Sequence, residues 1–131
     1  MKMKNKITLI LIVLISSFGL AQTGAKIEFK AKENTIDYGT ISKKTDNGIR
    51  SFEFINTGDA PLIITNVLST RECSVLTKPT EPIMPGKNGK IDVKYSMILG
   101  PIRKTITVET NAINYEDGRI ALKIKGEVVG D

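Results

Sequence analysis

The alternation of apolar and polar residues at every second position is the feature that most constrains the fold of this chain. After residue 22 the apolar segments repeat with a period of two, not with the period of 3.6 that is typical of a helix. The alternating segments are 27–29, 36–38, 52–54, 91–95 and 120–124. Because successive side chains of a strand point to opposite faces of a sheet, each segment is predicted to be a strand with one apolar and one solvated face.

Turn-forming residues separate these segments at short intervals. Gly, Pro, Asn and Asp cluster at 46–48, 85–89, 100–101 and 117–118. Short strands divided in this way favour an antiparallel sandwich or barrel over parallel strands with connecting helices. The segment 77–85 is too rich in proline for a central strand, and we expect it to cross from one sheet to the other, as a Greek key requires.

The segment 52–75 is predicted to contain two strands joined by a tight connection. Asn56 begins the interruption, and Gly58 allows a positive φ within it. Asp59 can hydrogen-bond its own backbone, whereas Pro61 cannot donate to a ladder and belongs at the start of a strand. The rest of the chain is expected to pair with this hairpin.

Three local features refine the pattern. Residues 62–68 are largely apolar at both parities, which predicts that both faces of this strand are covered. Ile49 is out of phase with the apolar residues 52 and 54, so a bulge or a late strand start is expected between them. Pro85 and Gly86 are predicted to form a turn in which Gly86 has a positive φ.

The N-terminal segment has the pattern of a signal peptide. Lysines at positions 2, 4 and 6 precede an apolar run of 14 residues, 7–20, which ends in small residues suited to signal peptidase. As a helix this run would be about 21 Å long, short of the roughly 30 Å hydrocarbon core, and no cysteine follows it for lipid attachment. We expect residues 1–21 to be removed before Gln22, which leaves 22–131 as one exported domain with no stable membrane span.

The charge of the mature chain is lower than that of the whole sequence. Residues 22–131 hold 16 basic and 14 acidic side chains, a net charge of +2 in place of +5. Lysines alternate with acidic residues along the predicted strands, and the small groups Lys43-Lys44 and Lys123, Lys125 are interpreted as solvated faces. Nucleic-acid binding would need clustered basic residues with stacking aromatic residues, so no nucleic-acid partner is expected.

Histidine does not occur in the chain, which excludes Ser-His-Asp and Cys-His catalysis and removes the commonest metal ligand. The polar segment 114–118 has a faint likeness to a calcium loop but lacks the ligand spacing, so it is interpreted as a hairpin turn. The sequence therefore predicts no catalytic residues, no cofactor and no metal.

Cys73 is the one cysteine and hence the one candidate reactive thiol. Arg71 would favour its thiolate, and Glu72 would oppose it. In one interpretation the thiol packs as a small apolar group at a strand end. In the other it forms an intermolecular disulfide or binds copper together with Met84 or Met97.

Four spaced motifs lie between residues 52 and 128. They are F-x-F-x-N-T-G-D-A-P-L-x-I at 52–64, I-x-P-G-K-x-G-x-I-x-V-x-Y at 83–95, K-T-I-T-V at 104–108 and L-K-I-K-G-E-V at 122–128. This order resembles the bacterial Domain of Unknown Function 1573 family, and the resemblance runs from about Ile27 to Val128. The resemblance implies an exported immunoglobulin-like sandwich related to major sperm protein and Hydin-type domains, and no established activity. Members usually carry Cys-Gly-Cys where this chain has Arg71, Glu72 and Cys73, so only the second thiol is matched.

The sequence and the resemblance together predict an all-β chain, an immunoglobulin-like antiparallel β-sandwich of about seven to eight strands with Greek-key connections. The expected function is that of an exported, non-catalytic module, periplasmic or secreted, which binds a protein or glycan of the envelope or is a structural part of it. The alternative is a thiol-dependent redox or copper-handling periplasmic protein that uses Cys73.

Overall fold

The computed structural model describes residues 23–130. The predicted signal peptide, residues 1–21, and its cleavage before Gln22 lie outside the described residues. In chain order the elements are β1 (Ile27–Phe29), the 3-10 turn η1 (Lys32–Asn34), β2 (Thr35–Ser42), β3 (Ile49–Asn56), β4 (Ile64–Leu68), β5 (Cys73–Thr77), β6 (Asn88–Tyr95), β7 (Gly100–Thr110), the 3-10 turn η2 (Glu116–Gly118) and β8 (Arg119–Val129).

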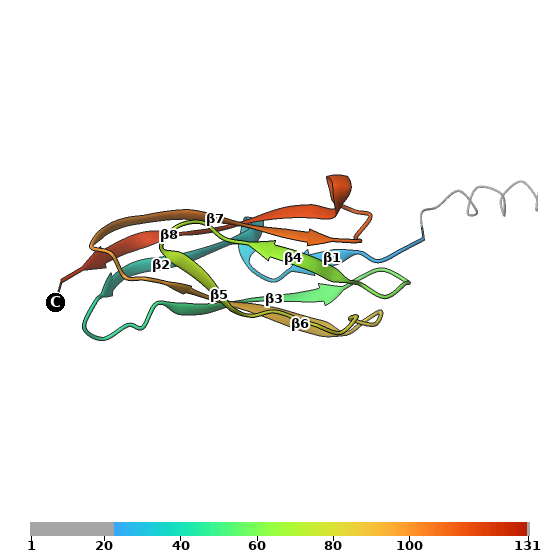
Figure 1. The fold of residues 1–131 in the computed structure, drawn as a ribbon, viewed down its shortest axis with the longest axis horizontal. Coiled ribbons are helices and arrows are strands. Elements are labelled where there is room, and N and C mark those ends of the chain that lie inside the picture. Colours follow the sequence, from blue (N-terminus) through green and yellow to red (C-terminus); the bar gives the residue numbers. More distant parts are fainter. Residues whose placement is uncertain (1–22, 131) are drawn as a thin grey trace, which may run out of the picture.

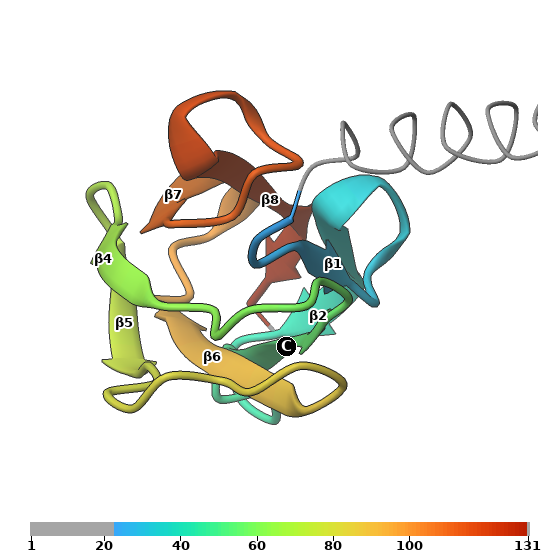
Figure 2. The same ribbon diagram turned by 90° about the vertical axis from the view of Figure 1, so that its right-hand side faces the viewer.

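The strands form two four-stranded sheets packed face to face, which confirms the predicted all-β sandwich (Figure 1). The strand order is β1-β3-β6-β5 in sheet A and β2-β8-β7-β4 in sheet B. Viewed end on, β4 and β5 form one side of the sandwich, and β1 and β2 form the other (Figure 2).

One pairing differs from the predicted antiparallel pattern. Among the described strands five pairs are antiparallel, whereas β2 and β8 are parallel. β1 and β2 both run towards the end that carries the C-terminus, so the chain moves from sheet A to sheet B through η1 without reversing (Figure 1). This places β2 beside the last strand and in the same direction as that strand.

The core consists of the inward-facing residues of both sheets. Phe52 and Phe54 of β3 are fully buried, and both rings contact the ring of Phe29, at centroid distances of 6.3 Å and 5.3 Å. Sheet B covers them with buried aliphatic residues of β7 and β8, such as Ile106 and Leu122. Burying a side chain of this size contributes about 1.5–3 kcal/mol, so this layer is the main source of stability.

The predicted hairpin of residues 52–75 is wrong. β3 belongs to sheet A, where it pairs with β1 and β6, whereas β4 belongs to sheet B and pairs with β7. The connection 57–63 therefore crosses between the sheets. Leu62 explains why it does so, because this residue is fully buried and forms an isolated bridge with Ile83 before β4 begins at Ile64.

The predicted crossing of residues 77–85 is also wrong. The segment joins β5 to β6, which are antiparallel neighbours in sheet A. Its prolines end the pairing after Thr77 and do not redirect the chain to the other sheet.

Two further expectations are wrong: the bulge or late strand start after Ile49, and the covering of both faces of residues 62–68. β3 pairs with β6 without a bulge, so Ile49 lies on the outer face, and Ile63 and Leu68 remain 43% and 42% exposed rather than covered.

Candidate functional site

Basic side chains gather on the outer face of sheet B. Arg103 of β7 and Lys123 and Lys125 of β8 line a shallow hollow of about 540 Å³ together with Thr35 and Thr105. Register explains the grouping, because Arg103 lies opposite Lys125 and Thr105 lies opposite Lys123. These residues are called the basic hollow below.

The charges of the basic hollow lack acidic partners. Within residues 23–130 none of the three cations has a carboxylate at ion-pair distance. Asp37 is the register neighbour of Lys125 on β2, but its Oδ1 accepts a hydrogen bond from the Gly39 N–H at 2.9 Å. Like charges placed directly opposite one another on a sheet are destabilising, so Arg103 and Lys125 form an unfavourable pair in the isolated domain.

The opposite end of the same two strands shows the usual arrangement. Glu109 lies opposite Arg119, and their charged groups are 3.5 Å apart. The outer face of sheet B therefore has a neutralised end and a cationic end. The cationic end can bind carboxylate or phosphate groups, for which the planar guanidinium of Arg103 offers two parallel donors.

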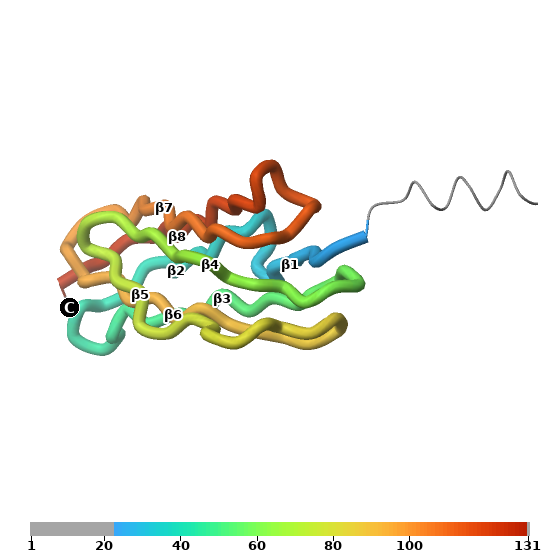
Figure 3. The backbone as a smooth tube through the Cα atoms, turned by 45° about the vertical axis from the view of Figure 1, so that its right-hand side comes forward, coloured from blue at the N-terminus to red at the C-terminus, as the bar shows by residue number. Residues whose placement is uncertain are grey.

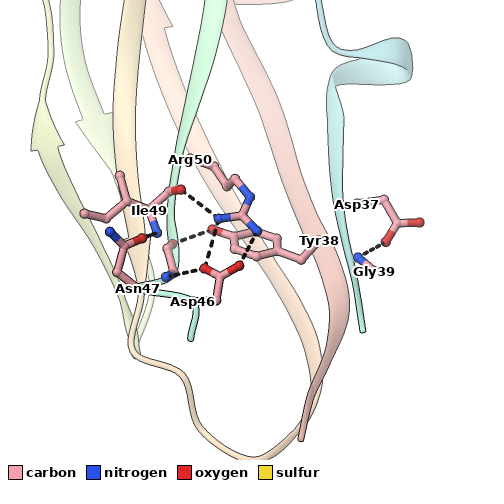
Figure 4. A network of polar contacts seen from close by, with 8 residues as sticks. Asp37, Tyr38, Gly39, Asp46, Asn47, Ile49 and Arg50 are labelled. Carbon is pink, nitrogen blue, oxygen red and sulfur yellow. Dashed lines mark hydrogen bonds and ion pairs between the residues drawn. The ribbon is translucent and has the colours of Figure 1, made fainter. Parts of the chain in front are cut away.

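A second polar cluster fixes the connection between β2 and β3 (Figure 4). The Arg50 guanidinium lies 4.1 Å above the Tyr38 ring and donates to both oxygens of Asp46, at 3.1 Å and 2.8 Å. The Tyr38 hydroxyl donates to the Gly48 carbonyl at 2.8 Å. Burial raises the pKa of Tyr38 to about 12, and the Arg50 hydrogen bond lowers the pKa of Asp46. Every member has a partner within the cluster, which therefore holds the connection in place.

Cys73 lies at the start of β5 opposite Tyr95 and is 6% exposed. Burial raises the pKa of the thiol, and the Lys104 ammonium lowers it by a smaller amount. The cation that acts on the thiol is thus Lys104, not the predicted Arg71. Met84 precedes β6 at the end far from Tyr95, so the fold does not bring it to the thiol. This environment favours packing over thiolate chemistry.

The residues predicted to shape the 56–61 turn contact residues that are more distant in the sequence than expected. Asn56 is fully buried, and its side chain bonds four backbone groups. Gly58 does not have a positive φ; instead a Cβ there would lie 2.2 Å from the Gly24 carbonyl oxygen. The Asp59 carboxylate accepts from the Gly24 N–H at 2.7 Å and not from its own backbone. Pro61 lies three residues before β4, and its carbonyl accepts a hydrogen bond from the Asn111 side chain.

The two remaining predicted turns lie in connections. Pro85 and Gly86 form a turn before β6, and Gly86 has a φ of 82°. The polar segment 114–118 joins β7 to β8 and contains η2. In the described part of the chain, no group of three or more His, Cys, Asp or Glu side chains is placed to hold a metal ion. No helix among residues 23–130 has the length and apolar character needed to cross a membrane.

The basic hollow was not predicted from the sequence. Lys123 and Lys125 were visible as a pair but fit a solvated strand face equally well. The deciding signal is Arg103, which lies on another strand and joins the group through the β7–β8 register. Pairing residues 100–110 with residues 119–129 as a hairpin around the turn at 117–118, with Glu109 opposite Arg119, would have placed Arg103 opposite Lys125.

Solved structures share the fold at low sequence identity. A protein of unknown function from Porphyromonas gingivalis W83 has a TM-score of 0.65 at 15% identity over 84% of this chain, which spans 50% of that protein. The PapD-like domain 7 of human CEP192 gives 0.59 at 10% identity, covering 86% of this chain and 92% of the domain. The VesB protease of Vibrio cholerae gives 0.57 at 13%, covering 79% of this chain and 31% of the protease.

These identities support a common immunoglobulin- and PapD-like sandwich and nothing about activity. A comparison with curated proteins finds no significant match. The family described as Protein of unknown function (DUF1573) matches residues 29–128, and all four spaced motifs lie within that range. This chain therefore belongs to the DUF1573 family.

Proposed function

We propose that the chain is an exported, non-catalytic immunoglobulin-like module that binds a protein or glycan of the bacterial envelope carrying carboxylate or phosphate groups. The pattern of residues 1–21 supports export. The binding surface is the basic hollow of Arg103, Lys123 and Lys125.

The observation that carries this proposal is the unneutralised pair of Arg103 and Lys125. Their Cα positions are directly opposed on β7 and β8, with no carboxylate of the described chain at ion-pair distance. Such a pair costs stability in the free domain, and an anionic ligand removes that cost on binding. Hydrogen bonds from charged donors to carboxylate or phosphate are also the stronger kind.

The sheet edges support binding by a face and not by strand addition. β1 has three residues, and β2, β4 and β5 each contain a register shift. Short edge strands and bulges are the features by which sheets resist pairing with another chain. All four edges of the two sheets are protected in one of these ways.

Charge reversal at Arg103 tests the proposal. Arg103→Glu places opposite charges across the β7–β8 pair, so the variant is expected to be as stable as the wild type or more stable by about 0.2–1 kcal/mol. It should nevertheless lose the partner that the wild-type protein captures from an envelope extract. Capture by the wild type should weaken with rising salt, as screening requires.

The matched control is Lys87→Glu, which makes the same change of charge on an exposed residue of the connection before β6. It should keep the partner. If Arg103→Glu captures the same partner as the wild type, or if Lys87→Glu loses it equally, the basic hollow is not the binding surface.

A further inference from the structure

An exposed apolar dipeptide forms the connection between β6 and β7. Ile98 and Leu99 are 46% and 57% exposed, and Leu99 is the most exposed of the large apolar side chains in residues 23–130. The residues on both sides have positive φ values, 61° at Met97 and 109° at Gly100. A positive φ at a non-glycine residue such as Met97 is uncommon and strained.

The connection is held firmly despite its exposed tip. Met97 is buried to 6% exposure, and its sulfur would lie 3.1 Å from a Cβ placed on Gly48. The Ser96 N–H donates to the Glu72 carbonyl at 2.9 Å. Met97 thus points into the domain while the next two side chains remain in solvent. The backbone conformation of residues 96–100 therefore holds the Ile98 and Leu99 side chains in solvent.

Two other connections lie at the same end of the sandwich. The Gly48 carbonyl accepts from the Tyr95 N–H and the Glu72 carbonyl from the Ser96 N–H, so residues 43–48 and 69–72 adjoin residues 96–99. The tube view shows the three connections at the end that carries the C-terminus, opposite the first described residues (Figure 3). Residues 43–48, 69–72 and 96–99 are called the loop end below.

The loop end is cationic around its apolar dipeptide. Lys43, Lys44 and Arg71 are exposed, and within the described chain none of them has a carboxylate at ion-pair distance. The two acidic residues of these connections are already neutralised by strand residues. Asp46 pairs with Arg50 at 2.8 Å, and Glu72 pairs with Lys104 at 3.1 Å.

We propose that the loop end docks on the surface of an anionic lipid bilayer. Ile98 and Leu99 enter the boundary between headgroups and acyl chains, and Lys43, Lys44 and Arg71 contact the lipid phosphates. Aliphatic side chains that project from a surface and are flanked by lysine and arginine are suited to this environment, because each group meets its own layer of the lipid. The charge of the loop end commits the occupant to an anionic surface.

Flotation with lipid vesicles tests this inference on the mature protein. Wild-type protein should bind vesicles of phosphatidylglycerol and phosphatidylethanolamine in equal parts and should not bind vesicles of phosphatidylcholine. The double variant Ile98→Ser with Leu99→Ser should reduce the partition coefficient about tenfold or more. Leu76→Ser is the control, because Leu76 is 47% exposed on β5, outside the loop end, and its loss should leave binding unchanged.

A fluorescent reporter follows insertion directly, because the chain contains no tryptophan. In Leu99→Trp the emission should shift to the blue with anionic vesicles and should be quenched by spin-labelled lipid. Lys43→Gln with Lys44→Gln should weaken binding about tenfold, since each basic residue near an anionic surface contributes separately. Lys78→Gln with Lys87→Gln, the same change away from the loop end, should not.

Three results would overturn the inference: no vesicle binding by the wild type, equal binding by the Ile98 and Leu99 double variant, or no blue shift for Leu99→Trp. Vesicle binding that is lost in Arg103→Glu but kept in the Ile98 and Leu99 double variant would also overturn it, because the lipid would then bind the basic hollow. The inference is independent of the proposed partner, since capture from an envelope extract is scored with Arg103→Glu and vesicle binding is scored with the loop-end variants.

Discussion

Replacement of Asn56 by alanine is expected to be among the most damaging polar substitutions in the domain. Asn56 is fully buried, and its side-chain amide donates to the carbonyls of Ala60 and Ile83 at 2.9 Å and 2.8 Å. Its carbonyl oxygen accepts from the N–H groups of Gly58 and Lys26 at 2.9 Å and 3.3 Å. One side chain thus joins the end of β3, the residue before β1 and the connection before β6.

The magnitude follows from these four hydrogen bonds. Each intramolecular hydrogen bond contributes about 1 kcal/mol net, and a buried partner left without one costs about 1–3 kcal/mol. Asn56→Ala should therefore lower the free energy of unfolding by about 3–5 kcal/mol, a large part of the roughly 5–15 kcal/mol of a domain. Asn56→Asp should be at least as damaging at neutral pH, because a buried carboxylate would face the two carbonyl oxygens.

Urea denaturation followed by circular dichroism measures the change, with Asn111→Ala as the matched control. Asn111 also bonds two backbone groups, the Ile63 N–H at 2.8 Å and the Pro61 carbonyl at 3.1 Å, but it is exposed and water can replace it. The control should lose about 1 kcal/mol or less. Equal midpoints for Asn56→Ala and Asn111→Ala would refute the argument that burial makes the Asn56 contacts costly to lose.

Three further predictions concern the core, the glycines and a buried phenol. Phe54→Ala should lower the free energy of unfolding by about 3–5 kcal/mol, whereas Glu53→Ala, which removes an exposed ion pair, should cost about 1 kcal/mol or less; equal urea midpoints would contradict the facing of β3. Gly58→Ala should lower the melting temperature more than Gly86→Ala, because its Cβ meets a backbone carbonyl and the Gly86 Cβ meets nothing; the reverse order would refute this. Burial raises the pKa of Tyr38 to about 12 from an unfolded value near 10, so the stability that depends on the protonated phenol is present below about pH 10 and is lost as the pH rises towards 12. Tyr38→Phe should flatten this alkaline loss in pH-dependent melts, and an unchanged slope would count against it.

The strands and their facing could be predicted because both are local properties. A period of two needs only neighbouring residues, and the burial of Phe52 and Phe54 with the exposure of Glu53 follows from it. The spaced motifs were sufficient to identify the family for the same reason. Local pattern also places the turn at Pro85 and Gly86, since proline and glycine act through their own φ values.

The assignment of strands to sheets could not be predicted, because it depends on contacts between distant segments. A connection of the length of 57–63 can close a hairpin or cross a sandwich. The crossing is favoured by the contacts of Asn56 with Lys26 and Ile83, which are 30 and 27 residues away. The parallel pairing of β2 with β8 likewise joins distant residues, such as Thr35 and Lys123.

The same limit explains why the basic hollow was missed and why Arg71 was wrongly chosen as the cation beside the thiol. Its position two residues before Cys73 suggested Arg71, because such residues share a face in a continuous strand. However, residues 71–72 form a turn, and β5 begins only at Cys73. The fold instead brings Lys104 of β7 towards Cys73 and Glu72. A charged site on a sheet is made across strands, so its composition is known only when the register is known.

The positions of the two proposed surfaces allow both to be occupied at once. Arg103 follows Gly100 on β7 by three residues, which is about 10 Å along the strand. The loop end closes the sandwich at one end of its long axis (Figure 1). The basic hollow lies on the outer face of sheet B. A domain docked by Ile98 and Leu99 would stand on the lipid with sheet B roughly perpendicular to the bilayer. The basic hollow would then face sideways just above the headgroups, open to an anionic partner held near the same membrane.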